Sequence, residues 1–281
     1  MEGVILITGA SGRIGRRAAE FLAHDAHRIR LMTRDPGRAP QLPGAEIVRG
    51  DFADPATLDR AFAGIRTALV ISGSGKPGER AILHRNAFQA AARAGVRHLV
   101  YLSLEGAAPD SRYPYSRDHY LSEQFLADAG PPFTVLRNAF YLDMFLEKFD
   151  SRGVVRGPAK QGLGAFVSRE DAARTAAAAV RNRVAGVYDV TGPDALSVAE
   201  VARRLSALTG RELRYQEGDA GPDELSSGWY EAIAAGELAR VTDTVRQLTG
   251  NPPLRLEEYF KQFPRLLEKL SLTPPANTTE S

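Results

Sequence analysis

The sequence contains no cysteine among its 281 residues. This absence excludes disulfide bonds, thiolate metal ligands and cysteine nucleophiles, and it agrees with a reducing compartment, so we expect a cytoplasmic protein. Long apolar runs are also absent. None approaches the roughly twenty residues that a helix needs to span a bilayer, and the first residues show no signal-peptide pattern. We therefore expect no membrane partner.

A charge excess of one sign is missing as well. The chain carries 36 basic and 34 acidic residues, a net charge of +2, which gives no reason to expect nucleic acid as a partner. Neither a Gly-x-Ser-x-Gly nucleophile elbow nor paired histidines at zinc spacing are found, so we expect no metal. What the chain does have is 43% hydrophobic residues, enough for a nucleotide-binding sheet with a smaller lobe.

Three glycines directly follow an apolar strand at residues 4–7. They are Gly9, Gly12 and Gly15, and a helical pattern over 16–24 and a second strand over 28–33 come after them. In a dinucleotide-binding turn such glycines allow the tight turn, the approach of backbone N–H groups to a pyrophosphate, and close packing of helix on sheet. We interpret the segment in this way; a glycine-rich turn that merely joins strand to helix is the alternative.

The end of the second strand is where such a unit chooses its cofactor. A carboxylate there favours NAD, whereas an arginine accommodates the 2′-phosphate of NADP. The tip carries Arg34, with Arg38 as a possible second positive charge, and we favour NADP because a guanidinium matches phosphate geometry. Two alternatives stay open. Asp35 either faces the ribose or starts the turn before Pro36, and the two arginines could be surface residues only.

Strand and helix patterns alternate through the first half of the chain, which predicts a parallel sheet with helices on both faces. The expected strands are 46–49, 67–72, 97–103 and 133–137, and the expected helices are 55–63, 78–94 and 116–129. Later, Ser168 is expected to cap a helix to residue 182, followed by a strand at 187–190 and a helix over 197–208 that ends at Gly210. Residues 273–281 are expected to be disordered.

Several motifs together give the chain a family resemblance. They are Thr8-Gly9-Ala10-Ser11-Gly12-Arg13-Ile14-Gly15, Arg34-Asp35-Pro36, Gly50-Asp51-Phe52, His84-Arg85-Asn86, Leu136-Arg137-Asn138 with Phe140-Tyr141, and Ser168-Arg169-Glu170-Asp171-Ala172-Ala173. In these motifs the chain resembles, over nearly its whole length, the NmrA-like atypical short-chain dehydrogenases, and most closely the bacterial NADPH-dependent quinone oxidoreductases of type 2.

The resemblance implies a Rossmann-type doubly wound parallel sheet with a small α+β C-terminal lobe. Residues 1–150 would form the nucleotide-binding domain, 165–192 would return to its sheet, and 193–272 would form the substrate lobe. It further implies NADPH and a cleft for a flat substrate such as a quinone. We expect a monomer or a homodimer.

The resemblance also assigns residues to the cofactor. Gly9, Ser11, Gly12, Arg13 and Ile14 would cradle the pyrophosphate. Arg34 would meet the 2′-phosphate, Asp51 and Phe52 would flank adenine, and Ser72 and Gly73 would line the path toward nicotinamide.

Candidate proton donors follow from a departure from the Tyr-x-x-x-Lys pair of better-known dehydrogenases. Here His119 stands four residues after Tyr115, where lysine would be. Either side chain is a candidate acid, with Ser103 as a hydrogen-bond partner; the alternative is a tyrosine and a histidine that are only solvated or locally bonded. The missing lysine argues against alcohol oxidation more than against quinone reduction, because a reduced quinone leaves a more stable oxygen anion.

Candidate substrate contacts lie after the last strand of the first half. Asn138 follows an apolar strand at the carboxyl edge of the sheet, where ligands bind. Phe140 and Tyr141 fit either a substrate wall or ordinary core. Trp229, the only tryptophan, follows Ser226-Ser227-Gly228, which we expect to be flexible, so it is a candidate for a mobile lid; packing in the core of the small lobe is the alternative.

Two functions therefore compete. The first is an NADPH-dependent reductase of quinones or similar flat acceptors that works by direct hydride transfer. The second is a non-catalytic redox sensor that binds the dinucleotide and acts through a protein partner. A reductase or isomerase of a sugar or natural-product intermediate is a weaker third possibility.

Overall fold

The computed structural model describes residues 3–24, 28–73, 75–221 and 223–270, and a seven-stranded sheet lies at its centre. The strand order is β3-β2-β1-β4-β5-β6-β9, and every neighbouring pair is parallel. The bounds are β1 (Val4–Ile7), β2 (Ile29–Thr33), β3 (Glu46–Arg49), β4 (Ile65–Ile71), β5 (His98–Leu104), β6 (Phe133–Asn138) and β9 (Gly186–Val190). This is the Rossmann order, which reverses direction between β1 and β4 and opens a ligand crevice there. The expected disordered segment 273–281 lies outside the described residues.

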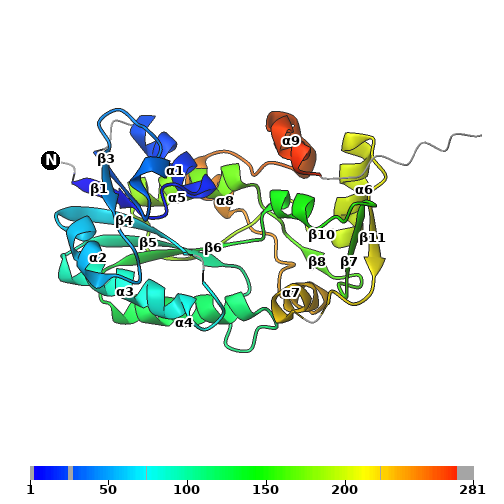
Figure 1. Ribbon diagram of the computed structural model, residues 1–281, viewed down its shortest axis with the longest axis horizontal. Helices are drawn as coiled ribbons and strands as arrows, with labels where there is room; N and C mark the ends of the chain where they lie inside the picture. The colour runs from blue at the N-terminus through cyan, green and yellow to red at the C-terminus, as the bar shows by residue number, and fades with distance from the viewer. Residues whose placement is uncertain (1–2, 25–27, 74, 222, 271–281) are drawn as a thin grey trace, which may run out of the picture.

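Helices cover both faces of this sheet (Figure 1). One layer holds α1 (Arg13–His24), α5 (Arg169–Asn182) and α8 (Thr244–Thr249); the other holds α2 (Pro55–Phe62), α3 (Arg80–Arg93) and α4 (Pro114–Asp128). The strands carry apolar side chains on both sides. On β1, for example, Ile5 and Ile7 belong to the hydrophobic cluster under α1 and α5, whereas Leu6 belongs to the cluster under α2 and α3. Burial on both faces is what a parallel sheet requires.

Helix α5 shows how local sequence sets the element. The Ser168 side chain accepts a hydrogen bond from the backbone N–H of Asp171, which satisfies a donor of the first turn. Ala172, Ala176 and Ala179 are fully buried, and such small side chains let α5 pack closely on the sheet and on α1.

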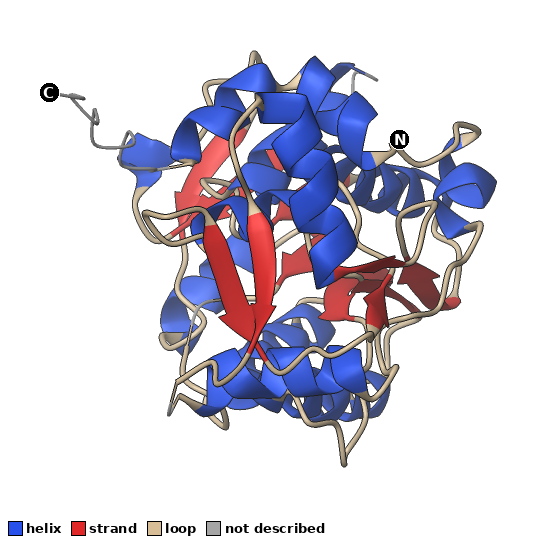
Figure 2. Ribbon diagram, turned by 90° about the vertical axis from the view of Figure 1, so that its right-hand side faces the viewer, coloured by secondary structure: helices blue, strands red, loops and turns tan. Residues whose placement is uncertain are grey.

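A second group of elements lies at the other end of the molecule (Figures 1 and 2). The strands are β7 (Val154–Gly157) paired in parallel with β11 (Arg214–Glu217), and β8 (Leu163–Gly164) paired antiparallel with β10 (Leu196–Ser197). The helices are α6 (Val198–Thr209), α7 (Glu224–Ala234) and α9 (Leu256–Gln262), and the 3-10 turns of this group are η2 (Leu142–Glu147) and η3 (Pro264–Lys269). Apart from β8, these elements contribute to a hydrophobic cluster of their own. A third 3-10 turn, η1 (Pro36–Arg38), follows β2 of the central sheet. The division of the chain into two domains at residue 193 stays a prediction.

The prediction that Ser226-Ser227-Gly228, before Trp229, form a flexible segment is wrong. Residues 226–228 lie inside α7, whose first turn is capped by the Asp223 carboxylate. Gly228 is present for packing, because a Cβ there would lie 2.6 Å from the backbone oxygen of Arg112. Trp229 is 2% exposed and contacts the rings of Phe140 and Phe145, so it belongs to the core and not to an exposed lid.

Across the described ranges, no helix combines the length and the apolar character that crossing a bilayer requires.

Candidate functional site

A hollow of about 390 Å³ lies over the carboxyl ends of β1, β2, β3 and β4, where a doubly wound sheet binds its ligand. We call it the nucleotide hollow. Its lining residues are Gly9, Ser11, Gly12, Met32, Thr33, Arg34, Gly50, Asp51, Phe52, Ala53, Ile71, Ser72, Gly73 and Leu83.

The glycine loop forms one wall of the nucleotide hollow. Gly9 has φ +60°, a conformation that favours glycine, and Gly12 donates its N–H to the Gly9 oxygen. A Cβ on Gly15 would lie 2.3 Å from that same oxygen, so only glycine lets α1 start this close to the strand. The first N–H groups of α1 have no carbonyl partner within the helix and are free to hold a pyrophosphate. These residues therefore fit a dinucleotide.

Arg34 and Asp35 have different environments. Arg34 is exposed and lines the nucleotide hollow, and no ion pair to it is found within the described residues. The Asp35 side chain accepts the N–H of Gly37 and caps η1, as a turn-starting aspartate does. Arg38 lies on η1 beyond the hollow lining, where its carbonyl oxygen accepts from Arg16.

The loop after β3 is held from α3. Phe52 is buried at the edge of the nucleotide hollow, and its carbonyl oxygen accepts from the Asn86 side chain. The Asp51 carboxylate accepts the N–H of Ala53, which fixes the turn. On the same helix, His84 Nε2 accepts the Gly73 N–H at 3.3 Å. The His84-Arg85-Asn86 motif thus positions both loops beside the hollow.

The Arg13 side chain has a carboxylate partner of its own. It pairs with the Asp143 carboxylate of η2, which also binds Arg169 at 2.8 Å and is itself fully buried. Only the backbone N–H of Arg13 is left for a phosphate, and the same is true of Ile14, whose side chain is buried in the core. Asp143 gave no sequence signal, because its partners are 130 and 26 residues away.

A second hollow, of about 240 Å³, adjoins the first, since both are lined by Ile71 and Ser72. We call it the substrate hollow. Its other lining residues are Arg80, Leu102, Ser103, Leu104, Tyr113, Tyr115, His119, Ala139, Phe140, Tyr141 and Met144. Its walls are mainly aromatic and aliphatic, which is typical of small-molecule sites.

The structure brings Tyr115 and His119 together in the substrate hollow but gives them other partners than expected. Tyr115 donates to the Gly75 oxygen at 3.1 Å. His119 Nε2 lies 3.3 Å from Arg80 Nη2, and its Nδ1 lies 2.7 Å from the Tyr101 hydroxyl. Burial, with the nearby Arg80 charge, holds the His119 pKa well below its usual range. The imidazole is therefore neutral at physiological pH, which argues against an imidazolium acid.

Ser103 is not bonded to either candidate donor. Its hydroxyl donates to the Glu123 carboxylate at 2.5 Å, and that carboxylate also pairs with Arg137. The expected hydrogen bond from Ser103 to Tyr115 or His119 is wrong, because a buried carboxylate is the stronger acceptor.

Arg80 is a residue of this hollow that sequence reasoning missed. Its Nε donates to the Gly73 oxygen at 3.1 Å, and its Nη2 donates to the Ser72 hydroxyl at 3.0 Å. The guanidinium carbon lies 4.2 Å from the Tyr115 ring centre. The available signal was its spacing from His84, four residues on and so on the same helix face.

Asn138 lies behind the hollow and does not line it. It is 1% exposed, and its amide donates to the Tyr141 hydroxyl at 3.1 Å. Phe140 and Tyr141 do line the hollow, and Arg169 covers the Tyr141 ring at 4.2 Å. Asn138 therefore orients Tyr141, which lines the hollow. The direct contact between Asn138 and substrate that the sequence predicted is not supported.

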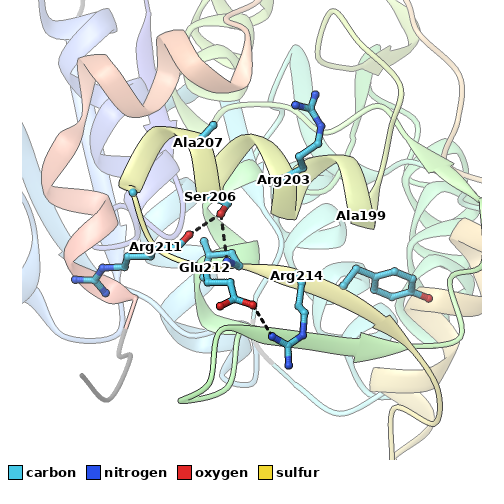
Figure 3. Close-up of a pocket in the computed structure, with 10 residues that line it drawn as sticks. Ala199, Arg203, Ser206, Ala207, Arg211, Glu212 and Arg214 are labelled. Atoms are coloured by element: carbon cyan, nitrogen blue, oxygen red, sulfur yellow. Dashed lines mark hydrogen bonds and ion pairs between the residues drawn. The ribbon is translucent and has the colours of Figure 1, made fainter. Parts of the chain in front are cut away.

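A larger hollow, of about 810 Å³, lies far from these residues, between α6 and β11 (Figure 3). Its arginines already have partners: Arg203 pairs with Glu200, Arg214 pairs with Glu212, and Arg211 donates to the Leu270 oxygen. We assign no site there. Within the part of the chain that the structure describes, no group of three His, Asp or Glu side chains is placed to hold a metal ion.

Comparisons with known proteins agree with the glycine loop and the sheet. A family model described as NAD(P)H-binding matches residues 9–183. A relative from Streptomyces griseus, (4-alkanoyl-5-oxo-2,5-dihydrofuran-3-yl)methyl phosphate reductase, is 34% identical, with 89% of this chain and 94% of the relative covered. Quinone oxidoreductase 2 of Escherichia coli is 31% identical, with 91% and 96% covered.

A solved structure extends the likeness to three dimensions. The NADPH-dependent quinone oxidoreductase of Escherichia coli in complex with NADPH superposes with a TM-score of 0.84 at 29% identity, covering 92% of this chain and 99% of that one. The chain belongs to the NAD(P)H-binding family and is one of its NmrA-like oxidoreductases.

Proposed function

We propose that this protein transfers a hydride from NADPH to quinones or similar flat electron acceptors. The observation that carries the proposal is the junction of the two hollows at Ile71 and Ser72. A dinucleotide whose phosphates lie on the glycine loop would reach this junction with its nicotinamide end. The relatives named as quinone and furanone-phosphate reductases support the same class of reaction.

The preference for NADPH over NADH rests on Arg34. Its guanidinium lines the nucleotide hollow and pairs with no carboxylate of the described residues, whereas Asp35 is engaged as the cap of η1. Such a guanidinium can bind the 2′-phosphate of NADPH through charge-assisted hydrogen bonds.

The protein's own contribution to the reaction is to bind the cofactor and the acceptor and to orient them toward each other. When bound, the nicotinamide supplies the hydride. Tyr113, Tyr115, Phe140 and Tyr141 form aromatic walls on which a flat acceptor can stack. Because His119 is neutral and accepts from Arg80, we infer that the final proton comes from water.

The test is to mix the purified protein with NADPH and a small panel of quinones and to follow the absorbance of reduced nicotinamide. We expect oxidation that depends on both protein and quinone. The competing function, a redox sensor without chemistry, predicts NADPH binding in a separate titration but no oxidation with any acceptor.

A further inference from the structure

Arg80 is a largely buried cation at the edge of the substrate hollow. It is 9% exposed, yet within the described ranges no carboxylate lies at ion-pair distance from its guanidinium. Asp118 on α4 is close enough to interact electrostatically with Arg80, but its two oxygens accept the N–H of Gly78 and form no ion pair with the guanidinium. A buried cation without a counter-ion is unfavourable unless a ligand supplies the missing charge.

Neutral groups hold this guanidinium in place. Nε donates a hydrogen bond to the Gly73 oxygen, and Nη2 bonds to the Ser72 hydroxyl and to His119 Nε2. Nη1 makes no hydrogen bond to any described residue. The Tyr115 ring gives partial compensation from one side.

His119 itself is fixed from behind. The Tyr101 hydroxyl bonds His119 Nδ1 at 2.7 Å and His84 Nδ1 at 3.0 Å. Burial lowers the pKa of both histidines, so neither competes with Arg80 as a cation. The arrangement presents one positive charge to the substrate hollow beside Ser72, and its Nη1 has no hydrogen-bond partner among the described residues.

We propose that Arg80 is a catalytic residue that receives the negative charge developing on the acceptor's oxygen. The inference rests on the proposed function and names its substrate class: conjugated carbonyl compounds whose reduction leaves a phenolate or enolate oxygen. The acceptor gains a hydride, that is two electrons and one proton, from NADPH, which becomes NADP⁺. The C4–H bond of NADPH breaks, the hydride bonds to a conjugated carbon of the acceptor, and the π electrons shift so that the carbonyl pair moves onto oxygen. Arg80 keeps its own proton, and a water molecule later protonates the anion and leaves as hydroxide. Fixed donors at developing charge are a major source of catalysis.

The test uses 4-nitrophenol, whose ionised form absorbs visible light, and the protein saturated with NADP⁺. We expect the wild-type protein to bind the phenolate at least about tenfold more tightly than the phenol, so that the pKa of the bound probe falls by about one unit or more. Arg80→Met should abolish this preference, and Arg80→Lys should keep part of it. The matched control is Arg93→Met on the same helix, an exposed arginine paired only with Asp59, which should behave as wild type.

Three results would overturn the proposal. They are a wild-type protein that binds both forms of the probe equally, one that binds neither, and an Arg80→Met variant that loses NADPH affinity as strongly as phenolate affinity. The first two results are measured on the wild-type protein, so the proposal can be rejected even if the Arg80→Met variant does not fold. A protein that prefers the phenolate but does not reduce any quinone would contradict the proposed reductase function. The proposed anion site at Arg80 would still be supported.

Discussion

Arg34 and Asp35 are neighbours of opposite charge, and the sequence left open which of them meets the ribose. The structure separates their environments, because Asp35 accepts the N–H of Gly37 in its own turn, while Arg34 lines the nucleotide hollow with no ion pair to the part of the chain that the structure describes. A side chain that is already a cap is a poor candidate for a second acceptor role.

The Arg34→Ala variant tests this assignment. We expect wild-type protein to bind NADPH about tenfold to a hundredfold more tightly than NADH, the size of one or two charge-assisted contacts, and the variant to lose most of that gap. Isothermal titration with both cofactors measures it. Equal affinities of the wild-type protein for NADPH and NADH would contradict the assignment and favour Asp35 as the residue that contacts the ribose.

His119 can be tested by variants that separate acid catalysis from positioning. His119→Gln offers an amide oxygen to Arg80, and we expect it to keep most turnover. His119→Ala should lose roughly tenfold, as expected for a lost hydrogen bond to a charged group. Steady-state rates across pH measure both. A loss in both variants that follows an ordinary histidine titration would mean that His119 is the acid after all.

Glu105 is a buried carboxyl group just after β5, and neither of its oxygens has a hydrogen-bond partner among the residues that the structure describes. Burial, with the nearby Asp189, raises its pKa from 4.5 to about 9. Between those values the folded protein holds a proton that the unfolded chain has released. Stability therefore falls as pH rises through this window.

The Glu105→Gln variant should remove that dependence. We expect it to be more stable than wild type at pH 8, by on the order of 2 kcal/mol, and similar to wild type near pH 4. Chemical denaturation at several pH values is the measurement. A variant that is less stable than wild type at pH 8 would show that the ionised Glu105 carboxylate makes a stabilising interaction in the folded protein.

At the scale of elements, the glycine loop and α1 are the part most fully predictable from sequence. Each glycine meets a requirement imposed by its immediate neighbours, such as the close approach of Gly15 to the Gly9 oxygen. The β-α alternation was predictable for the same reason, since strand and helix periodicity are local.

The Gly15→Ala variant tests this element. Its Cβ would lie 2.3 Å from backbone, whereas that of Gly12→Ala would lie 3.2 Å away. We expect Gly15→Ala to lower the melting temperature by several degrees and NADPH affinity by at least about tenfold, and Gly12→Ala to be milder in stability. Thermal unfolding and titration measure the two effects. Two variants with the same melting temperature would contradict the packing role given to Gly15.

Elements beyond residue 138 were harder to predict, because long-range contacts fix them. The Ser226-Ser227-Gly228 segment has loop-like composition, but Gly228 packs on the backbone of residue 112 and the segment is helical. Asp143 and Arg80 were missed in the same way. Asp143 is important through partners in other elements, which a local pattern does not report. For Arg80, the spacing from His84 marks the helix face, but its lack of an ion pair within the described residues is visible only in the structure.

At the scale of the whole molecule, buried charges link the cofactor side to the substrate side. Asp143 joins Arg13 at the start of α1 to Arg169 at the start of α5, and Arg169 in turn covers Tyr141 of the substrate hollow. The glycine loop and the substrate wall are therefore parts of one connected unit. The two adjoining hollows give that unit its proposed use, which is to hold a nicotinamide and an acceptor in contact.

The most direct test of that use is an anaerobic single-turnover experiment with NADPH and with NADPH deuterated at the transferable C4 position. The account predicts one hydroquinone formed per NADPH consumed and a step that deuterium slows severalfold, because the hydride passes directly between the two molecules. NADPH that binds but is never oxidised, or oxidation that is insensitive to deuterium and yields one-electron products, would contradict it.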